Sequence, residues 1–249
     1  MGSNLLLIAV IGAGIGFLGG LLGKGGSALA TPILAAIGVP PVVALAAPLP
    51  ATVPGTLVAA HGYRRKGLID TDVLKWSLAI GVPATVLGAF GSAWVDAHSL
   101  LLATDAIILV LGVRMLLSPG HGASGEDVEV SVQRTIAIAA ITGLSAGLLA
   151  NSGGFLLAPL FIAVLGLPIK PALGTSLAVA AVMAIPGSVV HLALGHLDLA
   201  VVAAFGIGSV PLSRLGSQVA LRTDPSRLER GYGAVLAVLG AGFLVNAFI

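Results

Sequence analysis

Long apolar runs, separated by short polar breaks or breaks rich in glycine and proline, organise the whole sequence. Several runs are about 17 to 20 residues long, enough for a helix to cross a hydrocarbon core of roughly 30 Å. The runs are continuous rather than alternating, so the pattern predicts helices and not strands. We expect runs near 4–22, 27–38, 43–61, 74–93 and 98–117, and then 133–150, 154–166, 172–193, 197–219 and 229–248.

Composition identifies the protein class. Charged residues make up 9% of the chain and hydrophobic residues 57%, against about a quarter charged in soluble domains, and the mean hydropathy is +1.09. These values predict an all-α, polytopic membrane protein. The net charge of +2 does not suggest a nucleic-acid partner, and the lack of cysteine excludes disulfides and thiol chemistry. The first run lacks a basic leader, so we expect it to be retained as a helix.

The second half of the chain repeats the first. A shift of 128 positions superimposes glycines, prolines and acids over most of the length, and polar residues 118–132 form the predicted linker between a first repeat, 1–117, and a second repeat, 133–249. Pro54-Gly55 corresponds to Pro186-Gly187 at a shift of 132 instead. The pairs at 128 include Gly25/Gly153, Gly38/Gly166, Gly67/Gly195, Asp70/Asp198, Gly88/Gly216 and Gly112/Gly240.

Basic residues predict how the two repeats are oriented, because Lys and Arg collect at the cytoplasmic ends of spans. Arg64, Arg65 and Lys66 follow the third run, whereas Arg222, Arg227 and Arg230 follow the ninth. Five crossings per repeat place both groups on the inside, and an odd number of crossings inverts the second repeat relative to the first. We therefore expect both termini outside the cytoplasmic membrane. Four crossings per repeat would put the two groups on opposite sides.

Two glycine-rich breaks, at residues 19–27 and 147–154, each precede a short apolar run. The run 27–38 makes about 18 Å of helix, too little to cross the bilayer. The N-terminus of such a half-helix presents free N–H groups and the positive end of its dipole, which favours an anion. The candidate substrate-binding residues are Lys24, Gly25, Gly26, Ser27, Asn151, Ser152, Gly153, Gly154, Thr175 and Ser176.

Each candidate also has a plainer explanation. Lys24 could extend to the inner surface, and the glycine pairs could simply make tight turns. Thr175 and Ser176, with Thr52 and Thr56 on the third run, could line a cavity or bond their own backbone. Asp105, the one acid expected well inside a run, is a candidate for proton coupling, although a position near the helix end explains it too.

The sequence carries no sign of a metal centre, a cofactor or an enzyme. His191 and His196 are five residues apart, not the three or four that share a helix face, and no carboxylate or thiol cluster joins them. No phosphate-binding loop, nucleophile motif or zinc-protease motif is present. We therefore expect no metal, no cofactor and no catalytic residues.

Several segments together resemble the sulfite exporter TauE/SafE family of membrane permeases, also called TSUP. They are Gly19 to Pro32, Gly147 to Pro159, Leu173-Gly174-Thr175-Ser176-Leu177, Ile185-Pro186-Gly187 and Gly195-His196-Leu197-Asp198. The resemblance covers nearly the whole chain. It implies transport of sulfite, thiosulfate, sulfonates and related organic anions across the cytoplasmic membrane. The chain departs from the family pattern at Lys24, where a small or apolar residue is usual, and at Asn151-Ser152, where the family is glycine-rich.

The expected function is secondary transport of a small anion by alternating access, with sulfite or another organosulfur anion favoured. An anion-selective channel and a carboxylate transporter stay open as alternatives, and an intramembrane enzyme is less favoured because no nucleophile and base share a depth. The expected partners are the anion and the lipid bilayer. Association into a homo-oligomer stays open.

Overall fold

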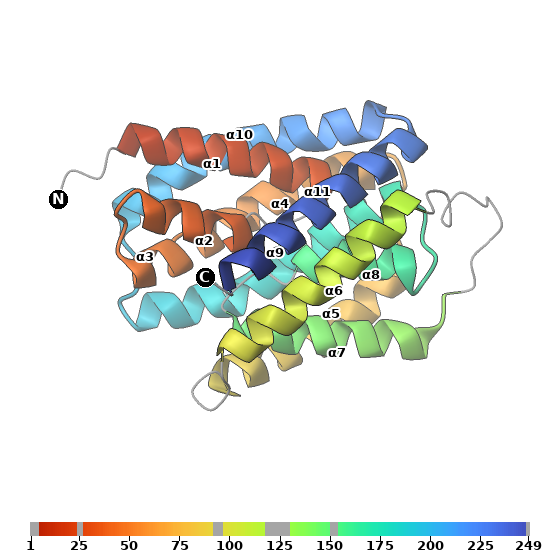
Figure 1. Cartoon of the computed structure of the whole chain (residues 1–249), viewed down its shortest axis with the longest axis horizontal. Helices are drawn as coiled ribbons and strands as arrows, with labels where there is room; N and C mark the ends of the chain where they lie inside the picture. The colour runs from red at the N-terminus through yellow and green to blue at the C-terminus, as the bar shows by residue number, and fades with distance from the viewer. Residues whose placement is uncertain (1–4, 24–26, 92–96, 118–129, 150–153, 248–249) are drawn as a thin grey trace.

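A computed structural model describes residues 5–23, 27–91, 97–117, 130–149 and 154–247 (Figure 1). Every regular element in these ranges is an α-helix, as the apolar runs predicted. The helices are α1 (Leu5–Leu22), α2 (Ser27–Ala36), α3 (Pro41–Ala46), α4 (Pro48–Arg64), α5 (Thr71–Gly91), α6 (Ala97–Leu117), α7 (Val132–Leu148), α8 (Gly154–Ala163), α9 (Ile169–Ala193), α10 (Leu199–Arg222) and α11 (Pro225–Ala247).

Five segments of the described chain are long and apolar enough to cross a membrane: α1, the α3–α4 pair, α5, α9 and α10. By contrast, α2 and α8 have 10 residues each, which makes about 15 Å of helix. Each follows a longer helix after a glycine-rich break. The expected pairing of a long helix with a short one therefore occurs once in each half of the chain.

The structure differs from the prediction in the third run, which we expected as one helix over 43–61. The helix starts at Pro41, is interrupted at Ala47 and continues from Pro48 to Arg64. Pro48 and Pro50 have no backbone N–H, so they cannot donate to the carbonyls four residues earlier. The paired prolines thus divide the helix where hydropathy alone predicts continuity.

The helices of the two halves interleave. In Figure 1, α1 lies along α10, and α11 lies along α6. Most of the extensive helix contacts join a helix before residue 118 to one after residue 131. These pairs are α1 with α10, α5 with α7, α6 with α11, α4 with α9, α4 with α10 and α5 with α9.

Exchanging each helix for its counterpart in the other half leaves this set of contacts unchanged. The pair α1 and α10 becomes α7 and α5, and the pair α6 and α11 maps onto itself. In the contact between α6 and α11, equivalent residues of the two halves make equivalent close approaches. A Cβ on Gly112 would lie 2.5 Å from the nitrogen of Ala237, and a Cβ on Gly240 would lie 2.8 Å from the nitrogen of Leu109. Gly112 and Gly240 are 128 positions apart, and so are Leu109 and Ala237.

The ends of equivalent helices are also built alike. Gly67 and Gly195 follow α4 and α9 in the left-handed region, with φ of 67° and 70°. The residue after each glycine donates its N–H, at 3.0 Å, to the carbonyl five residues earlier. This is the Schellman pattern, which satisfies a free carbonyl at a helix end.

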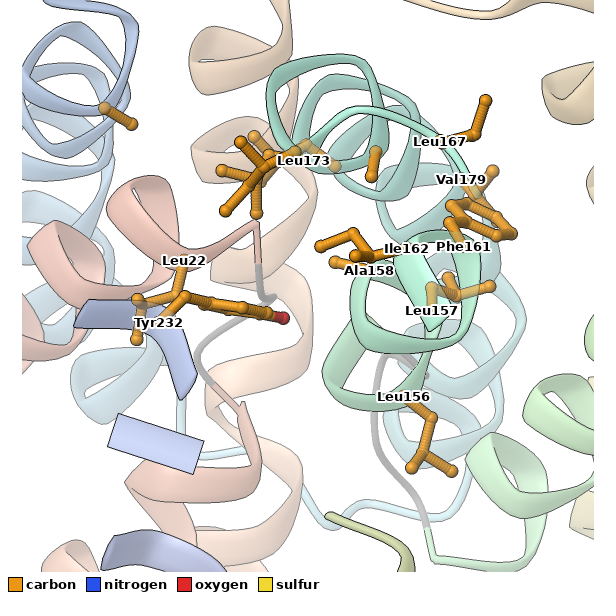
Figure 2. Close-up of a cluster of buried hydrophobic side chains, with 14 of the residues drawn as sticks. Leu22, Leu156, Leu157, Ala158, Phe161, Ile162, Leu167, Leu173, Val179 and Tyr232 are labelled. Atoms are coloured by element: carbon orange, nitrogen blue, oxygen red, sulfur yellow. The ribbon is translucent and has the colours of Figure 1, made fainter. Parts of the chain in front are cut away.

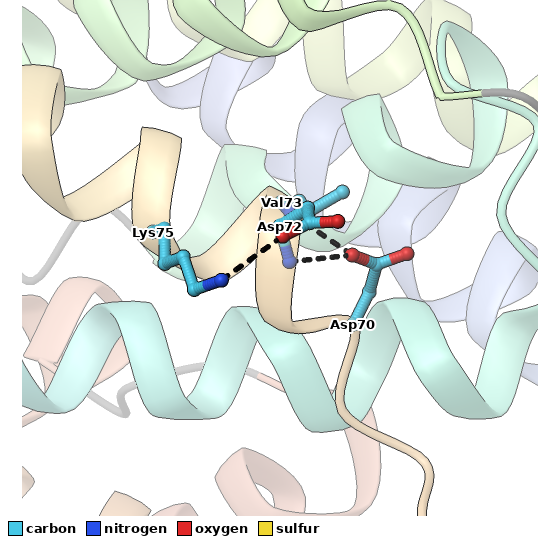
Figure 3. A network of polar contacts seen from close by, with 4 residues as sticks. All are labelled: Asp70, Asp72, Val73 and Lys75. Atoms are coloured by element: carbon cyan, nitrogen blue, oxygen red, sulfur yellow. Dashed lines mark hydrogen bonds and ion pairs between the residues drawn. The ribbon is translucent and has the colours of Figure 1, made fainter.

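The next helix of each half starts with an aspartate cap. The Oδ1 atom of Asp70 accepts from the backbone N–H groups two and three residues later, at 3.1 and 2.9 Å (Figure 3). The Oδ1 atom of Asp198 does the same at 2.8 and 3.2 Å. The match of helix ends and helix contacts supports the duplication predicted from the sequence.

Two observations support the predicted inversion of the second half. In Figure 1, α1 starts at the left of the view, beside the N-terminus, whereas its counterpart α7 starts at the right. Arg65 and Lys66, at the end of α4, line the same pocket as Arg222, at the end of α10. The two basic groups therefore lie at one end of the molecule, and the inverted topology of five crossings per half stays a prediction. The orientation of that end in the membrane stays a prediction.

Candidate functional site

Most of the predicted site lies outside the described residues. Lys24, Gly25, Gly26, Asn151, Ser152 and Gly153 are in the two segments that the structure does not describe. Ser27 and Gly154 are the first residues of α2 and α8, and the structure does not describe the surroundings of either. For these eight residues the anion site stays a prediction. Thr175 and Ser176 of α9 can be placed.

Ser176 holds the end of α1. Its hydroxyl is fully buried and shares its proton between the carbonyls of Gly23, at 3.0 Å, and Leu173, at 2.9 Å. Gly23 has φ +68°, and a Cβ there would lie 2.7 Å from Leu173 Cδ2. Glycine is thus required both by the backbone conformation and by the close approach of α9. The first glycine-rich break therefore starts in the interior, against a helix of the other half.

Thr175 makes a different contact from its neighbour. Its buried Oγ1 accepts a hydrogen bond of 2.9 Å from the backbone N–H of Asp70, the residue that caps α5. The hydroxyl therefore joins α9 to the start of α5. This contact gives Thr175 a structural role, and its participation in an anion site stays a prediction.

The interior short helix α8 packs against α9 in a large apolar cluster. Figure 2 shows Leu157, Ala158 and Phe161 of α8 in this cluster, with Leu22 of α1 and Tyr232 of α11. All five are buried. From Leu156 onward, α8 is thus enclosed mainly by protein, and its place beside a transport path stays a prediction.

A small cavity lies between α1, α4 and α10, and we call it the hydroxyl cavity. Its volume is about 20 Å³. Four hydroxyl side chains from α4 and α10 line it together with glycines and apolar groups. The complete lining is Ile15, Gly16, Gly19, Ala51, Thr52, Gly55, Thr56, Phe205, Ser209 and Ser213.

Three of these hydroxyls donate to main-chain carbonyls. Thr52 donates to Pro48 at 2.9 Å and Thr56 donates to Thr52 at 2.7 Å, while Ser213 donates to Gly55 at 2.9 Å. Thr52 and Thr56 therefore bond their own helix, which was one of the two roles considered for them, and their place in the substrate path stays a prediction. The cavity itself was not predictable from any one helix.

A second, open pocket of about 420 Å³ lies at the basic end of the molecule. Arg65, Lys66 and Arg222 line it, with Gln218 beside them. The pocket thus brings three cationic side chains together at one end of the bundle. The pocket can concentrate anions at this end of the bundle.

Two acidic residues bear on the prediction of proton coupling. Asp105 lies in α6, but the structure does not describe its side chain. The sequence did not single out Glu229 as a buried acid, yet its side chain is 5% exposed and lies one turn into α11. The predicted run starts at residue 229, which puts Glu229 at the edge of the run, whereas α11 begins at Pro225. The signal was present, since Asp224 before Pro225 is a typical helix start, and Asp224 Oδ1 does accept from Ser226 N at 3.0 Å.

His191 and His196 meet, contrary to the inference from their spacing. Their Nδ1 atoms are 3.1 Å apart. The spacing rule applies within a continuous helix, but α9 ends at Ala193 and Gly195 turns the chain back. Among the described residues no group of three or more metal-ligating side chains gathers, so this pair stands alone there.

Comparison with known proteins connects this architecture to a family. The model of the sulfite exporter TauE/SafE family matches residues 8–243, which is nearly the whole chain. The chain belongs to the TauE/SafE family. It is therefore a multi-pass membrane transporter and not an enzyme. The sequence resemblance to this family is confirmed.

Curated relatives of this TauE/SafE protein carry consistent names. A probable membrane transporter protein of Xylella fastidiosa is 28% identical, over 92% of each chain. The probable membrane transporter protein YjnA of Bacillus subtilis is 26% identical, over 94% of this chain and 97% of its own. A probable membrane transporter protein of Methanocaldococcus jannaschii is 25% identical, over 97% and 96%. No solved structure matches the chain.

Proposed function

We propose that this TauE/SafE protein is a secondary transporter of a small anion, with sulfite or another organosulfur anion as its substrate. The observation that carries the proposal is the buried junction of Gly23 with Ser176, where the break between α1 and α2 meets α9 of the other half. A half-helix that starts beyond this junction directs its free N–H groups into the protein interior.

The proposed site combines the two breaks. Lys24, Gly25 and Gly26 supply a positive charge and N–H groups from one half, and Asn151 to Gly154 supply neutral donors from the other. The interleaved contacts of the two halves support this, because a site at their interface changes shape when one half moves against the other. Alternating access follows from such a movement.

Ligand-dependent thermal stabilisation of the purified protein tests the proposal. The panel contains sulfite, thiosulfate, sulfoacetate, taurine, sulfate and simple carboxylates. A ligand that binds only the folded state stabilises it by about 2.7 kcal/mol at a hundred times its dissociation constant. We expect a shift with a sulfur anion, and we expect Lys24→Ala to abolish that shift.

The matched control is Lys75→Ala, which removes an exposed lysine of α5 whose partner is Asp72. This variant should respond to the anion as the unmodified protein does. Equal loss of the thermal shift in Lys24→Ala and Lys75→Ala would mean that the overall charge of the protein, and not the proposed site, determines anion binding. No shift with any anion of the panel would contradict the substrate class, and a shift with carboxylates alone would reassign it.

A further inference from the structure

Ser209 is the unusual member of the hydroxyl cavity. Its side chain is 5% exposed, and its Oγ has no hydrogen-bond partner within the described part of the chain. A buried hydroxyl without a partner is costly, and such groups in native proteins usually mark a bound water or ion. The cavity therefore needs an occupant that bonds to Ser209.

Size limits what this occupant can be. A volume of about 20 Å³ holds about one water-sized group, since a single water needs roughly 10–15 Å³ by the same measure. A multi-atom oxyanion such as sulfite does not fit. The occupant is therefore a water molecule or a single dehydrated ion, and the hydroxyl cavity is distinct from the proposed anion site.

The arrangement of protons favours a cation. Thr52, Thr56 and Ser213 have committed their hydroxyl protons to backbone carbonyls, so the lone pairs of these oxygens remain for an occupant. An anion needs donors, and only Ser209 has a free proton. A water has two protons to donate to the three acceptors, whereas a cation uses all four oxygens at once.

The end of α1 adds to this preference. Gly19 lines the cavity and lies in the last turn of α1, which ends at Leu22. The final four carbonyls of a helix have no partner within it, and that end of the dipole attracts positive charge. The same break thus presents a C-terminal helix end to the cavity and an N-terminal helix end, that of α2, to the proposed anion site.

We propose that the hydroxyl cavity binds one sodium ion that is transported with the anion. Neutral oxygen ligands without a carboxylate suit a monovalent cation better than Ca²⁺ or Mg²⁺, which are usually held by carboxylates. No titratable residue lines the cavity, so the anion supplies the compensating charge. Gly19 precedes Gly23 by one helical turn, about 6 Å, which places the two ligands close enough to favour each other. The coupling rests on the proposed function, whereas the sodium site does not.

The first experiment measures the melting temperature of the purified full-length protein in sodium, potassium and choline chloride at equal ionic strength, without any organic anion. We expect stabilisation by sodium alone. In Ser209→Ala, the sodium concentration for half-maximal stabilisation should rise at least tenfold. Ser188→Ala is the matched control, because Ser188 is a half-buried serine that donates to its own helix at Ala184 and does not line the cavity.

A second variant fills the cavity without a clash. A Cβ on Gly55 would lie 3.9 Å from Ser213, an ordinary contact distance. We therefore expect Gly55→Ala to fold normally and to lose the sodium response. Equal melting temperatures in all three salts, or an unchanged sodium response in both Ser209→Ala and Gly55→Ala, would overturn the proposal and leave a water as the occupant.

A last arm separates this inference from the proposed function. Sulfite is added to the sodium titration, and by linkage each ligand must change the affinity of the other by the same factor. Mutual enhancement supports co-transport. A sodium response that sulfite does not alter keeps the sodium site but overturns its coupling to sulfite.

Discussion

The glycines of α1 determine how closely this helix packs against α10. A Cβ on Gly12, Gly16 or Gly20 would collide with the backbone of Phe205, Ser209 or Ser213, respectively. Lipid tails are as apolar as leucine, so membrane helices associate largely through such close packing. The glycine stripe thus sets the positions of Ser209 and Ser213, which both line the hydroxyl cavity.

We expect Gly20→Ala to destabilise the protein by about 1–3 kcal/mol, the usual cost of overpacking. Its new methyl group would meet the Ser213 backbone, which cannot move without displacing α10. The measurement is the midpoint of thermal unfolding in detergent. Gly14→Ala is the control, because a Cβ there meets nothing within 4 Å and alanine favours the helix by about 1 kcal/mol. A neutral effect of Gly20→Ala would refute the tight crossing.

At the scale of the helix, each half uses the same ending and the same start. A glycine with positive φ closes α4 and α9, and an aspartate caps α5 and α10. These caps fix the connection between consecutive helices through local hydrogen bonds. Because both caps recur at a spacing of 128 residues, the duplication survives in local geometry even where side chains have diverged.

The aspartate cap of α10 can be tested by itself. Asp198→Ala removes the acceptor for two backbone N–H groups and should cost about 1 kcal/mol. Asp198→Asn keeps an acceptor in the same place and should cost much less, since asparagine caps nearly as well as aspartate. The denaturation midpoints of the two variants test this expectation. Equal losses of stability in Asp198→Ala and Asp198→Asn would show that the charge of Asp198, and not its hydrogen bonds to the helix start, stabilises the protein.

Hydropathy predicted the long helices well because burial in lipid demands little more than length and apolar composition. It missed the break at Ala47, since the average over a run does not register the missing N–H groups of Pro48 and Pro50. The spacing rule for a continuous helix misjudged His191 and His196, whose contact depends on a turn at Gly195. The hydroxyl cavity could not be predicted, because its lining comes from three helices that are far apart in the sequence.

For the whole molecule, the central feature is that both basic groups lie at one end. Arg65 and Lys66 line a pocket with Arg222, and Lys170 Nζ at the start of α9 donates to the carbonyl of Leu221 at 3.1 Å. From the distribution of positive charge, we expect this end to face the cytoplasm. With that orientation, we expect the open pocket to give the transport path a basic entrance on the cytoplasmic side.

Single cysteines can test this orientation on the natural background, because the chain contains no cysteine. We expect Lys66→Cys and Arg227→Cys to react with a membrane-impermeant thiol reagent only after the cytoplasmic side is exposed. Leu194→Cys, at the opposite end of α9, should react from outside. Labelling of Lys66→Cys and Arg227→Cys from opposite sides would contradict five crossings per half.

The interleaving of the halves has a consequence for biosynthesis. The partner of α1 is α10, which begins at Leu199, so about 180 residues must be made after α1 leaves the ribosome. At 5–20 residues per second this takes roughly 9–36 s. During that delay the glycine face of α1 meets lipid, the insertion machinery or a provisional neighbour. Maturation of this transporter must therefore include a late exchange of partners inside the bilayer.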